Sequence, residues 1–81
     1  MPVLMSHAEI FNAVMTALDM YNEGWKPDWE DGTYKYCVTR CGNNIIPITS
    51  RFDYHFISFN SASVRRKFMN EQCELLREFF R

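Results

Sequence analysis

The chain has 81 residues, a formal net charge of −1 and a hydrophobic fraction of 47%. This length allows one domain, expected to span residues 1–81, and the composition excludes a mainly disordered chain. A domain of this size buries only about 60% of its unfolded surface, so it depends on large side chains. Seven Phe, four Tyr and two Trp supply them.

The charges are unevenly distributed along the chain. Residues 1–34 carry one lysine against six carboxylates, and residues 35–81 carry eight Lys or Arg side chains against four carboxylates. Because the two halves pack together in one domain, this pattern predicts a dipolar surface. The near-zero total charge singles out no class of partner.

Nothing in the sequence predicts export or membrane insertion. The segment Met1–Met5 is too short for the apolar region of a signal peptide, and no apolar run approaches the roughly 20 residues of a membrane span. The three cysteines are an odd number, which favours free thiols in a reducing compartment. We therefore expect a cytoplasmic protein.

A helix is predicted over residues 7–22. Ser6 and Glu9 have the S-x-x-E spacing of a capping box, in which each side chain bonds the backbone N–H of the other residue. Apolar residues then recur every three or four positions. Gly24 ends the helix, since glycine adopts the left-handed conformation without strain. The apolar side chains that could staple the first turn are Val3, Leu4 and Ile10.

Three segments have strand-like character. In residues 33–40 and 52–59, successive side chains would alternate between the two faces of a strand, and many of them are β-branched or aromatic. Residues 45–49 between them are either a short strand or a loop. Pro47 cannot donate to a ladder, so a strand there would lie at the edge of the sheet.

The last predicted element is a helix over residues 62–80, which follows a polar cap cluster and carries a wide apolar face. The element order predicts an α+β fold. Both helices pack on one face of a two- to three-stranded antiparallel sheet.

Both tryptophans lie in the loop between the first helix and the first strand. Trp25, Pro27 and Trp29 are spaced by two, so in an extended segment their side chains point the same way. Pro27 stiffens this segment. We interpret the three residues as a structural lid over the helix–sheet seam, and a hot spot that faces a partner is the alternative.

Two groups of residues are candidates for partner contact. Asp28, Glu30 and Asp31 form an acidic cluster without the spacing of a calcium loop, so they are a solvated turn or a contact for a basic partner. Tyr54 and His55 lie on the aromatic strand segment, where one face could stay open to a partner.

No catalytic, metal or cofactor site is predicted. Cys37 and Cys41 are four residues apart and lack the second ligand pair of a zinc site. Cys73 lies on the apolar stripe of the last helix, where an inert core cysteine is favoured over a nucleophile paired with His55. We expect no enzymatic activity.

Nucleic-acid binding is the alternative to protein binding. Arg65, Arg66 and Lys67 at the start of the last helix could contact phosphates, and exposed tyrosines could stack on bases. However, the ribonucleoprotein motif is missing and the chain is not basic overall, which favours a solvated helix face.

The segment Tyr21–Trp29, followed by Tyr34–Tyr36, resembles a recurring segment of small uncharacterised proteins encoded by bacteriophages and mobile elements of gut bacteria. The family pattern is similar to NEGWxPDW…YKY, followed by an aromatic strand and a helix like residues 60–80. The resemblance covers about residues 18–80 and is lost between Arg40 and Arg51. It assigns no role to any residue.

The resemblance implies a small cytoplasmic protein of phage type. Many such proteins bind and block a host protein, including bacterial immunity nucleases. We therefore expect a protein-binding module that inhibits a host or defence protein in the manner of an anti-CRISPR protein. An outer strand could also pair with a second copy and form a homodimer.

Overall fold

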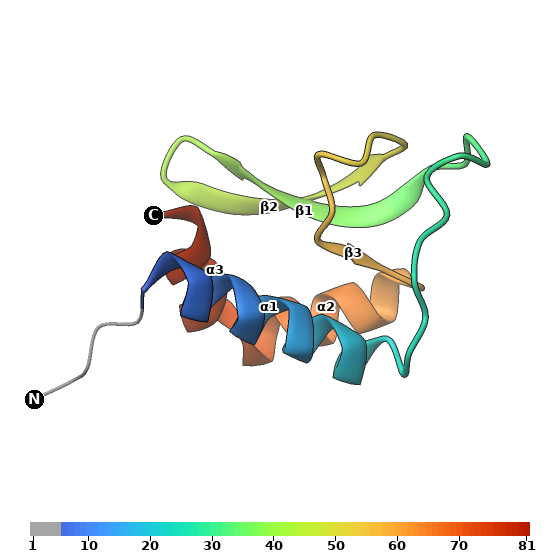
Figure 1. Ribbon diagram of the computed structural model, residues 1–81. Coiled ribbons are helices and arrows are strands. Elements are labelled where there is room, and N and C mark those ends of the chain that lie inside the picture. The colour runs from blue at the N-terminus through green and yellow to red at the C-terminus, as the bar shows by residue number, and fades with distance from the viewer. Residues whose placement is uncertain (1–5) are drawn as a thin grey trace, which may run out of the picture.

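Three helices lie on one side of a β-hairpin in the computed structural model, which describes residues 6–81 (Figure 1). The elements in chain order are α1 (His7–Tyr21), β1 (Lys35–Cys41), β2 (Asn44–Ser50), β3 (Ser58–Phe59), α2 (Ala62–Glu71) and α3 (Cys73–Phe80). The predicted α+β class, with helices packed on antiparallel strands, is confirmed.

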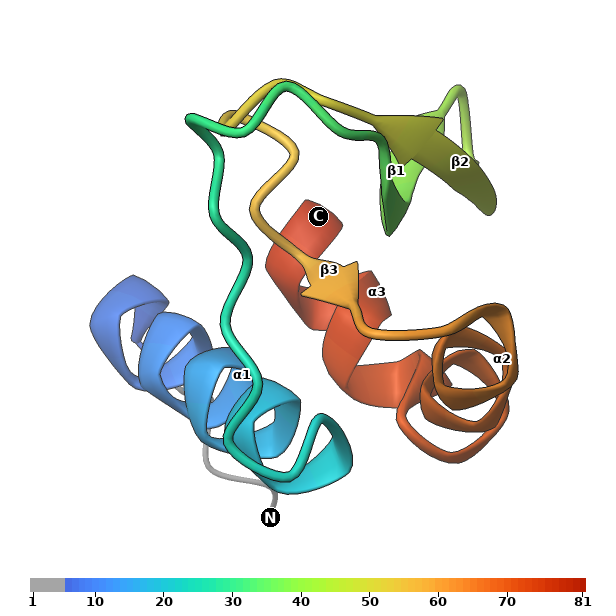
Figure 2. The same cartoon turned by 90° about the vertical axis from the view of Figure 1, so that its right-hand side faces the viewer.

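Helix α1 begins at the predicted capping box. The Glu9 N–H donates to Ser6 Oγ over 3.2 Å, and the Ser6 N–H donates to Glu9 Oε1 over 3.3 Å. The helix ends one residue before the predicted boundary, and Gly24 follows with φ +83°. After Gly24 the chain runs from the layer of helices to the β1–β2 hairpin (Figures 1 and 2). The staple predicted for Val3 or Leu4 lies outside the described residues.

The sheet has the strand order β2-β1-β3, and its pairings are antiparallel. Residues 45–49, which the sequence left open between strand and loop, belong to β2. Pro47 lies opposite Val38 in the β1–β2 pair. The Val38 N–H points away from β2 and donates to Ile57 O over 3.2 Å. Bonded and non-bonded pairs alternate in antiparallel strands, so Pro47 occupies a position where β1 needs no donor.

The predicted strand over residues 52–59 is wrong for most of its length, because only its last two residues, strand β3, pair with β1. The preceding part is irregular. Ser50 Oγ accepts the Phe52 N–H at 3.1 Å and lies 2.7 Å from His55 Nδ1, and the His55 N–H donates to Phe52 O. These local bonds take the backbone out of the ladder.

The predicted single helix over residues 62–80 is also wrong, because it is interrupted at Gln72, where φ is −116° and ψ is 26°. Gln72 Nε2 donates to the Tyr21 hydroxyl at 3.2 Å, and this hydroxyl donates to Glu71 at 2.6 Å. The break gives the two halves different neighbours. Helix α2 packs on β1 and β3, and α3 packs on α1.

The core lies between the helices and the strands. Its ring contacts include Phe59 on Phe68, with centroids 5.0 Å apart, and Tyr21 on Phe68, at 4.9 Å. The buried core cluster consists of Val14, Leu18, Val38, Ile57, Phe59, Phe68 and Leu76. Because Ile57 belongs to the core, the irregular segment after β2 is anchored at its far end.

Candidate partner-binding surface

An exposed aromatic tip forms where the loop before β1 meets the irregular segment after β2. We define it as Tyr34, Arg51, Phe52 and Tyr54, of which Tyr34 is 66%, Phe52 48% and Tyr54 68% exposed. The Phe52 and Tyr54 rings stack, with centroids 5.4 Å apart and planes within 7°. The Arg51 guanidinium lies 6.0 Å from the Tyr34 ring and 5.6 Å from the Phe52 ring. The Arg51 side chain therefore connects the loop before β1 with the irregular segment after β2.

A phenylalanine wall continues this surface towards α1 and α3. We define the wall as Phe11, Phe56, Phe79 and Phe80. The Phe56 ring lies 5.8 Å from Phe11 and 5.6 Å from Phe79, whose ring is 5.1 Å from Phe80. Phe11 is 45% exposed, and Met15, one turn further along α1, is 40% exposed. Phe11 is thus accessible, whereas Phe56, Phe79 and Phe80 are half-buried and pack against the core cluster.

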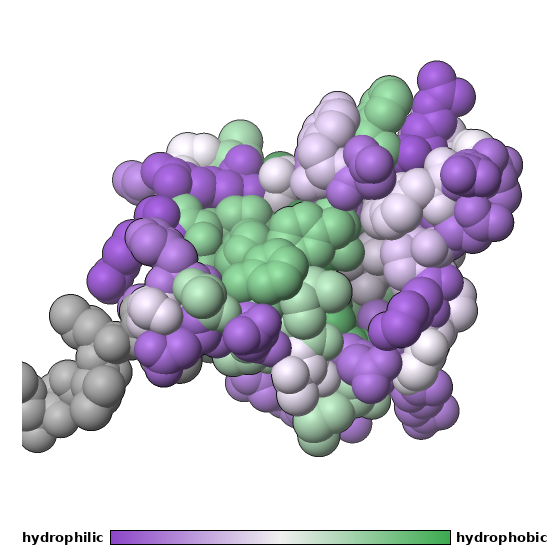
Figure 3. Space-filling model, in the orientation of Figure 1, coloured by the Kyte–Doolittle hydropathy of each residue, from purple (hydrophilic) through white to green (hydrophobic). Residues whose placement is uncertain are grey.

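The tip and the wall form one aromatic band. Tyr54 and Phe56 are next neighbours but one in the chain, and both line a small hollow of about 70 Å³ that Phe79 and Phe80 also line. Figure 3 shows a contiguous apolar patch over the middle of this face, with polar side chains around it. An exposed apolar patch rimmed by polar residues is typical of an interaction site.

Of the residues predicted to contact a partner, Tyr54 lies in the aromatic band and His55 lies beside it. The His55 ring is half-buried, with its centroid 4.5 Å from that of Tyr54 and its Nδ1 2.7 Å from Ser50 Oγ. Ser50 is only 4% exposed, so its hydroxyl is not accessible as a nucleophile. The Ser50–His55 contact instead holds the turn that presents Tyr54.

The predicted acidic cluster is divided by a buried lysine. Lys35 is 5% exposed, and its Nζ donates to Asp31 Oδ1 at 2.6 Å, to Thr33 O at 2.9 Å and to Thr33 Oγ1 at 3.1 Å. The hydrogen bond from Lys35, reinforced by the Thr33 N–H, lowers the pKa of Asp31 from 3.8 to about 2. Asp31, although 43% exposed, is therefore a structural partner of Lys35, and Asp28 and Glu30 are also exposed.

The tryptophan loop has the alternation that its spacing predicts. Trp25, Pro27 and Trp29 are half-buried, and the residues between them are exposed. The Trp29 ring lies 5.3 Å from Lys35 Nζ, and neither tryptophan belongs to the buried core cluster. Trp29 thus covers the buried ammonium, and a lid over the helix–sheet seam stays a prediction.

The basic run at the start of α2 is not uniform. Arg65 Nη1 donates to Ile48 O at 2.9 Å, and its guanidinium lies 5.4 Å from the Tyr36 ring. Arg65 is half-buried by these contacts, whereas Arg66 and Lys67 are exposed. Two of the three predicted phosphate ligands therefore face solvent, and the third ties α2 to the sheet.

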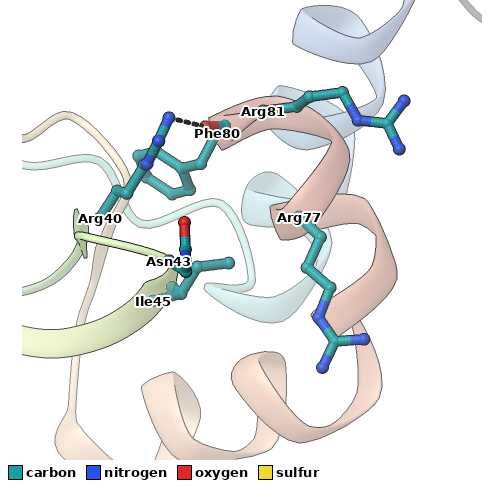
Figure 4. A pocket seen from close by; sticks show the side chains of 6 residues that line it. All are labelled: Arg40, Asn43, Ile45, Arg77, Phe80 and Arg81. Atoms are coloured by element: carbon teal, nitrogen blue, oxygen red, sulfur yellow. Dashed lines mark hydrogen bonds between the residues drawn. The ribbon is translucent and has the colours of Figure 1, made fainter.

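A second group of cations surrounds an open hollow of about 330 Å³ near the end of α3, which the sequence did not indicate. Figure 4 shows the side chains of Arg40, Arg77 and Arg81 pointing in different directions. Arg40 Nη1 donates to Phe80 O at 2.8 Å, while Arg77 and Arg81 pair with glutamates three residues earlier. Because the guanidinium groups do not converge, they make no binding site for a single anion.

The three cysteines differ in burial. Cys37 is fully buried, and burial raises the pKa of its thiol. Cys41 is exposed and Cys73 is half-buried. Within residues 6–81, no three His, Cys, Asp or Glu side chains are grouped so that they could hold a metal ion.

No protein-family model, curated protein or solved structure matches this chain. The resemblance to small phage proteins therefore stays a prediction. In the part of the chain that the structure describes, no helix has the length and apolar character needed to cross a membrane.

Proposed function

We propose that this protein is a small non-enzymatic module that binds another protein through the aromatic band. The observation that carries the proposal is a run of large rings from Tyr34 to Phe11, which are exposed at both ends of the run and half-buried between them. Tyr54 and Phe52 do not contribute the free energy of burial to the stability of the free protein, which would be about 1.5–3 kcal/mol for each side chain. A partner that covers them recovers this free energy.

The composition of the band is that of a binding hot spot. Tyrosine and arginine are enriched at hot spots, and the tip carries Tyr34, Tyr54 and Arg51. A tyrosine side chain has only two rotatable angles, so ordering it on binding costs little entropy. These features favour the tip as the centre of the contact.

The band is also held in place before a partner arrives. Ser50 and His55 hold one end of the irregular segment, and the Val38 N–H bonds Ile57 O at the other. A surface that is ordered in the free protein loses less conformational entropy on association. This supports direct recognition of a preformed surface.

We identify the partner class from the resemblance to phage proteins. The partner is a host or defence protein in the cytoplasm of a bacterium, and binding blocks its activity. Formation of a homodimer through strand β2 is less favourable than binding to such a protein. Pro47 directs its backbone nitrogen away from β1 and has no N–H to offer a neighbouring strand.

Affinity capture from a lysate of the bacterial host tests the proposal. The band variant combines Phe52→Ala with Tyr54→Ala, and the matched control combines Arg66→Ala with Lys67→Ala, which changes as many exposed residues elsewhere. We expect the wild type and the control to retain the same partner, and the band variant to bind the purified partner at least about 30-fold more weakly. Equal affinity of all three, or no partner for the folded wild type, would refute the proposal.

A further inference from the structure

The aromatic tip presents one charge of each sign next to its rings. Arg51, Phe52, Asp53 and Tyr54 follow one another in the chain, and all four are exposed. The Arg51 guanidinium lies 6.0 Å from the Tyr34 ring and 5.6 Å from the Phe52 ring. Within residues 6–81, however, neither Arg51 nor Asp53 forms an ion pair. A positive and a negative group thus remain available for contacts outside this chain.

The charges of the tip are complementary to those of a second copy of the tip. In a two-fold symmetric contact the same patch lies on both sides, so each contact between two different residues occurs twice. Two tips that face each other across such an axis bring Arg51 of one copy to Asp53 of the other. Phe52, which lies between these two residues in the chain, then meets aromatic rings of the other copy. The net charge of −1 keeps the long-range repulsion between copies small.

The exposed area of the tip suits a weak contact between copies. An aromatic side chain that is fully covered buries roughly 150–250 Å². At the exposed fractions of Tyr34, Phe52 and Tyr54, the three residues together offer about 300–450 Å² per copy. Arg51 and Asp53 add to this area, so two tips bury about 1,000 Å² in total, which is the lower limit for a specific interface. Such a contact forms and dissociates readily.

We propose that two copies of this chain associate reversibly through the aromatic tip, with Arg51 of each copy against Asp53 of the other. This contact uses the tip and not the edge of β2, where Pro47 hinders strand pairing. It does not depend on the proposed function, because it needs no host protein. The dimer covers rings that a partner protein would also cover, so self-association and partner binding compete for the tip.

A concentration series of the labelled full chain, followed by nuclear magnetic resonance, tests self-association. Between about 0.05 and 2 mM protein, we expect the amide resonances of Tyr34 and of residues 51–54 to shift. Translational diffusion should slow over the same range towards that of a dimer. The expected dissociation constant is about 0.1–1 mM, because the contact is small. A chain that still diffuses as a monomer of 9.7 kDa at the highest concentration would overturn the inference.

Two charge reversals distinguish this pairing from non-specific contact between rings. Arg51→Asp and Asp53→Arg change exposed residues, and urea unfolding checks that each variant folds. Each reversal places like charges opposite each other twice in the dimer and should weaken self-association at least about 5-fold. A mixture of the two variants restores both attractive contacts. Unlabelled Asp53→Arg should therefore shift the tip resonances of labelled Arg51→Asp with about the affinity of the wild-type dimer.

The matched control is Arg66→Asp, which has the same net charge as Arg51→Asp and changes an exposed arginine outside the tip. Arg66→Asp should dimerise like the wild type, and it should associate with Asp53→Arg more weakly than Arg51→Asp does. Equal association in the two mixtures, or a dimer that neither tip reversal weakens, would overturn the pairing. If the pairing fails while the band variant still loses its host partner, the proposed function stands. A dimer without any host partner would leave self-association alone standing.

Discussion

Replacing Trp29 with alanine tests whether the tryptophan loop is structural. The indole is half-buried, and its ring centre lies 5.3 Å from the Lys35 ammonium. Truncating a fully buried tryptophan costs about 3–5 kcal/mol, so half burial predicts roughly 2 kcal/mol. The lost cation–π contact adds about 0.5–1 kcal/mol. We therefore expect the free energy of unfolding to fall by about 2.5–3 kcal/mol.

The size of this loss decides whether the Trp29→Ala variant unfolds or remains folded with lower stability. A domain of 81 residues has a total stability of about 4–12 kcal/mol, so the Trp29→Ala variant folds unless the wild type lies near the lower limit. Urea unfolding at neutral pH, followed by far-ultraviolet circular dichroism, measures the loss. With a slope of about 1–3 kcal/mol per molar urea, the midpoint should fall by about 0.8–3 M.

Tyr34→Ala is the matched control, because Tyr34 is an aromatic residue near the same loop and is 66% exposed. Its truncation removes the exposed Arg51 contact and should change the free energy of unfolding by less than about 1 kcal/mol. If Trp29→Ala shifts the midpoint no further than Tyr34→Ala, the indole contributes nothing to the fold. Trp29 would then have to be assigned to a partner contact.

Three further outcomes are expected. Phe68→Ala removes a ring that is fully buried and should cost about 3–5 kcal/mol in the same urea assay. A smaller loss than for Trp29→Ala would contradict the packing of this ring on Phe59 and Tyr21. The pKa of Asp31 is lowered from 3.8 to about 2, so its ionised form stabilises the fold above pH 3.8 and this contribution is lost as the pH falls through about 2. An acid titration should therefore show a steeper loss of stability for the wild type than for Asp31→Asn, and parallel curves would speak against the Lys35 contact. Finally, we expect no binding of single-stranded DNA or RNA at low salt; binding that weakens with salt and disappears when Arg66 and Lys67 are both replaced by Glu would reinstate the nucleic-acid alternative.

Elements with local signals could be predicted from the sequence. The capping box at Ser6 places the start of α1, and period-two alternation places β1. Residues 52–59 alternate in the same way, but Ser50 bonds the following backbone and most of the segment stays outside the sheet. The break at Gln72 leaves no gap in the apolar stripe, so periodicity alone could not reveal it.

The candidate surface could be predicted only in part. The alternation of residues 52–59 predicts Tyr54 as a partner contact, and Tyr54 lies in the exposed tip, whereas no pattern in the sequence marks Lys35 as buried. Its burial depends on the preceding loop, since Asp31 and Trp29 enclose the ammonium from two sides. A sequence pattern does not show which loop folds over which strand.

The phenylalanine wall did leave a signal in the sequence. Phe11 and Met15 are one helical turn apart and lie beside the buried stripe of α1, which contains Ile10 and Val14. An apolar pair next to a complete core stripe indicates a second apolar face. The sequence does not show what this face meets, because its neighbours Phe56 and Phe79 are distant in sequence.

The phenylalanine wall joins residues from α1 and α3, which are synthesised at different times. Phe11 and Phe79 lie on the first and last helices of the described fold, and Phe56 holds their rings together. During synthesis the wall cannot assemble until residues beyond 79 have left the ribosome, since no shorter nascent chain contains all three rings. The complete wall therefore forms in one step once α3 has been synthesised, and a chain that stops before α3 should lack the Phe56–Phe79 contact.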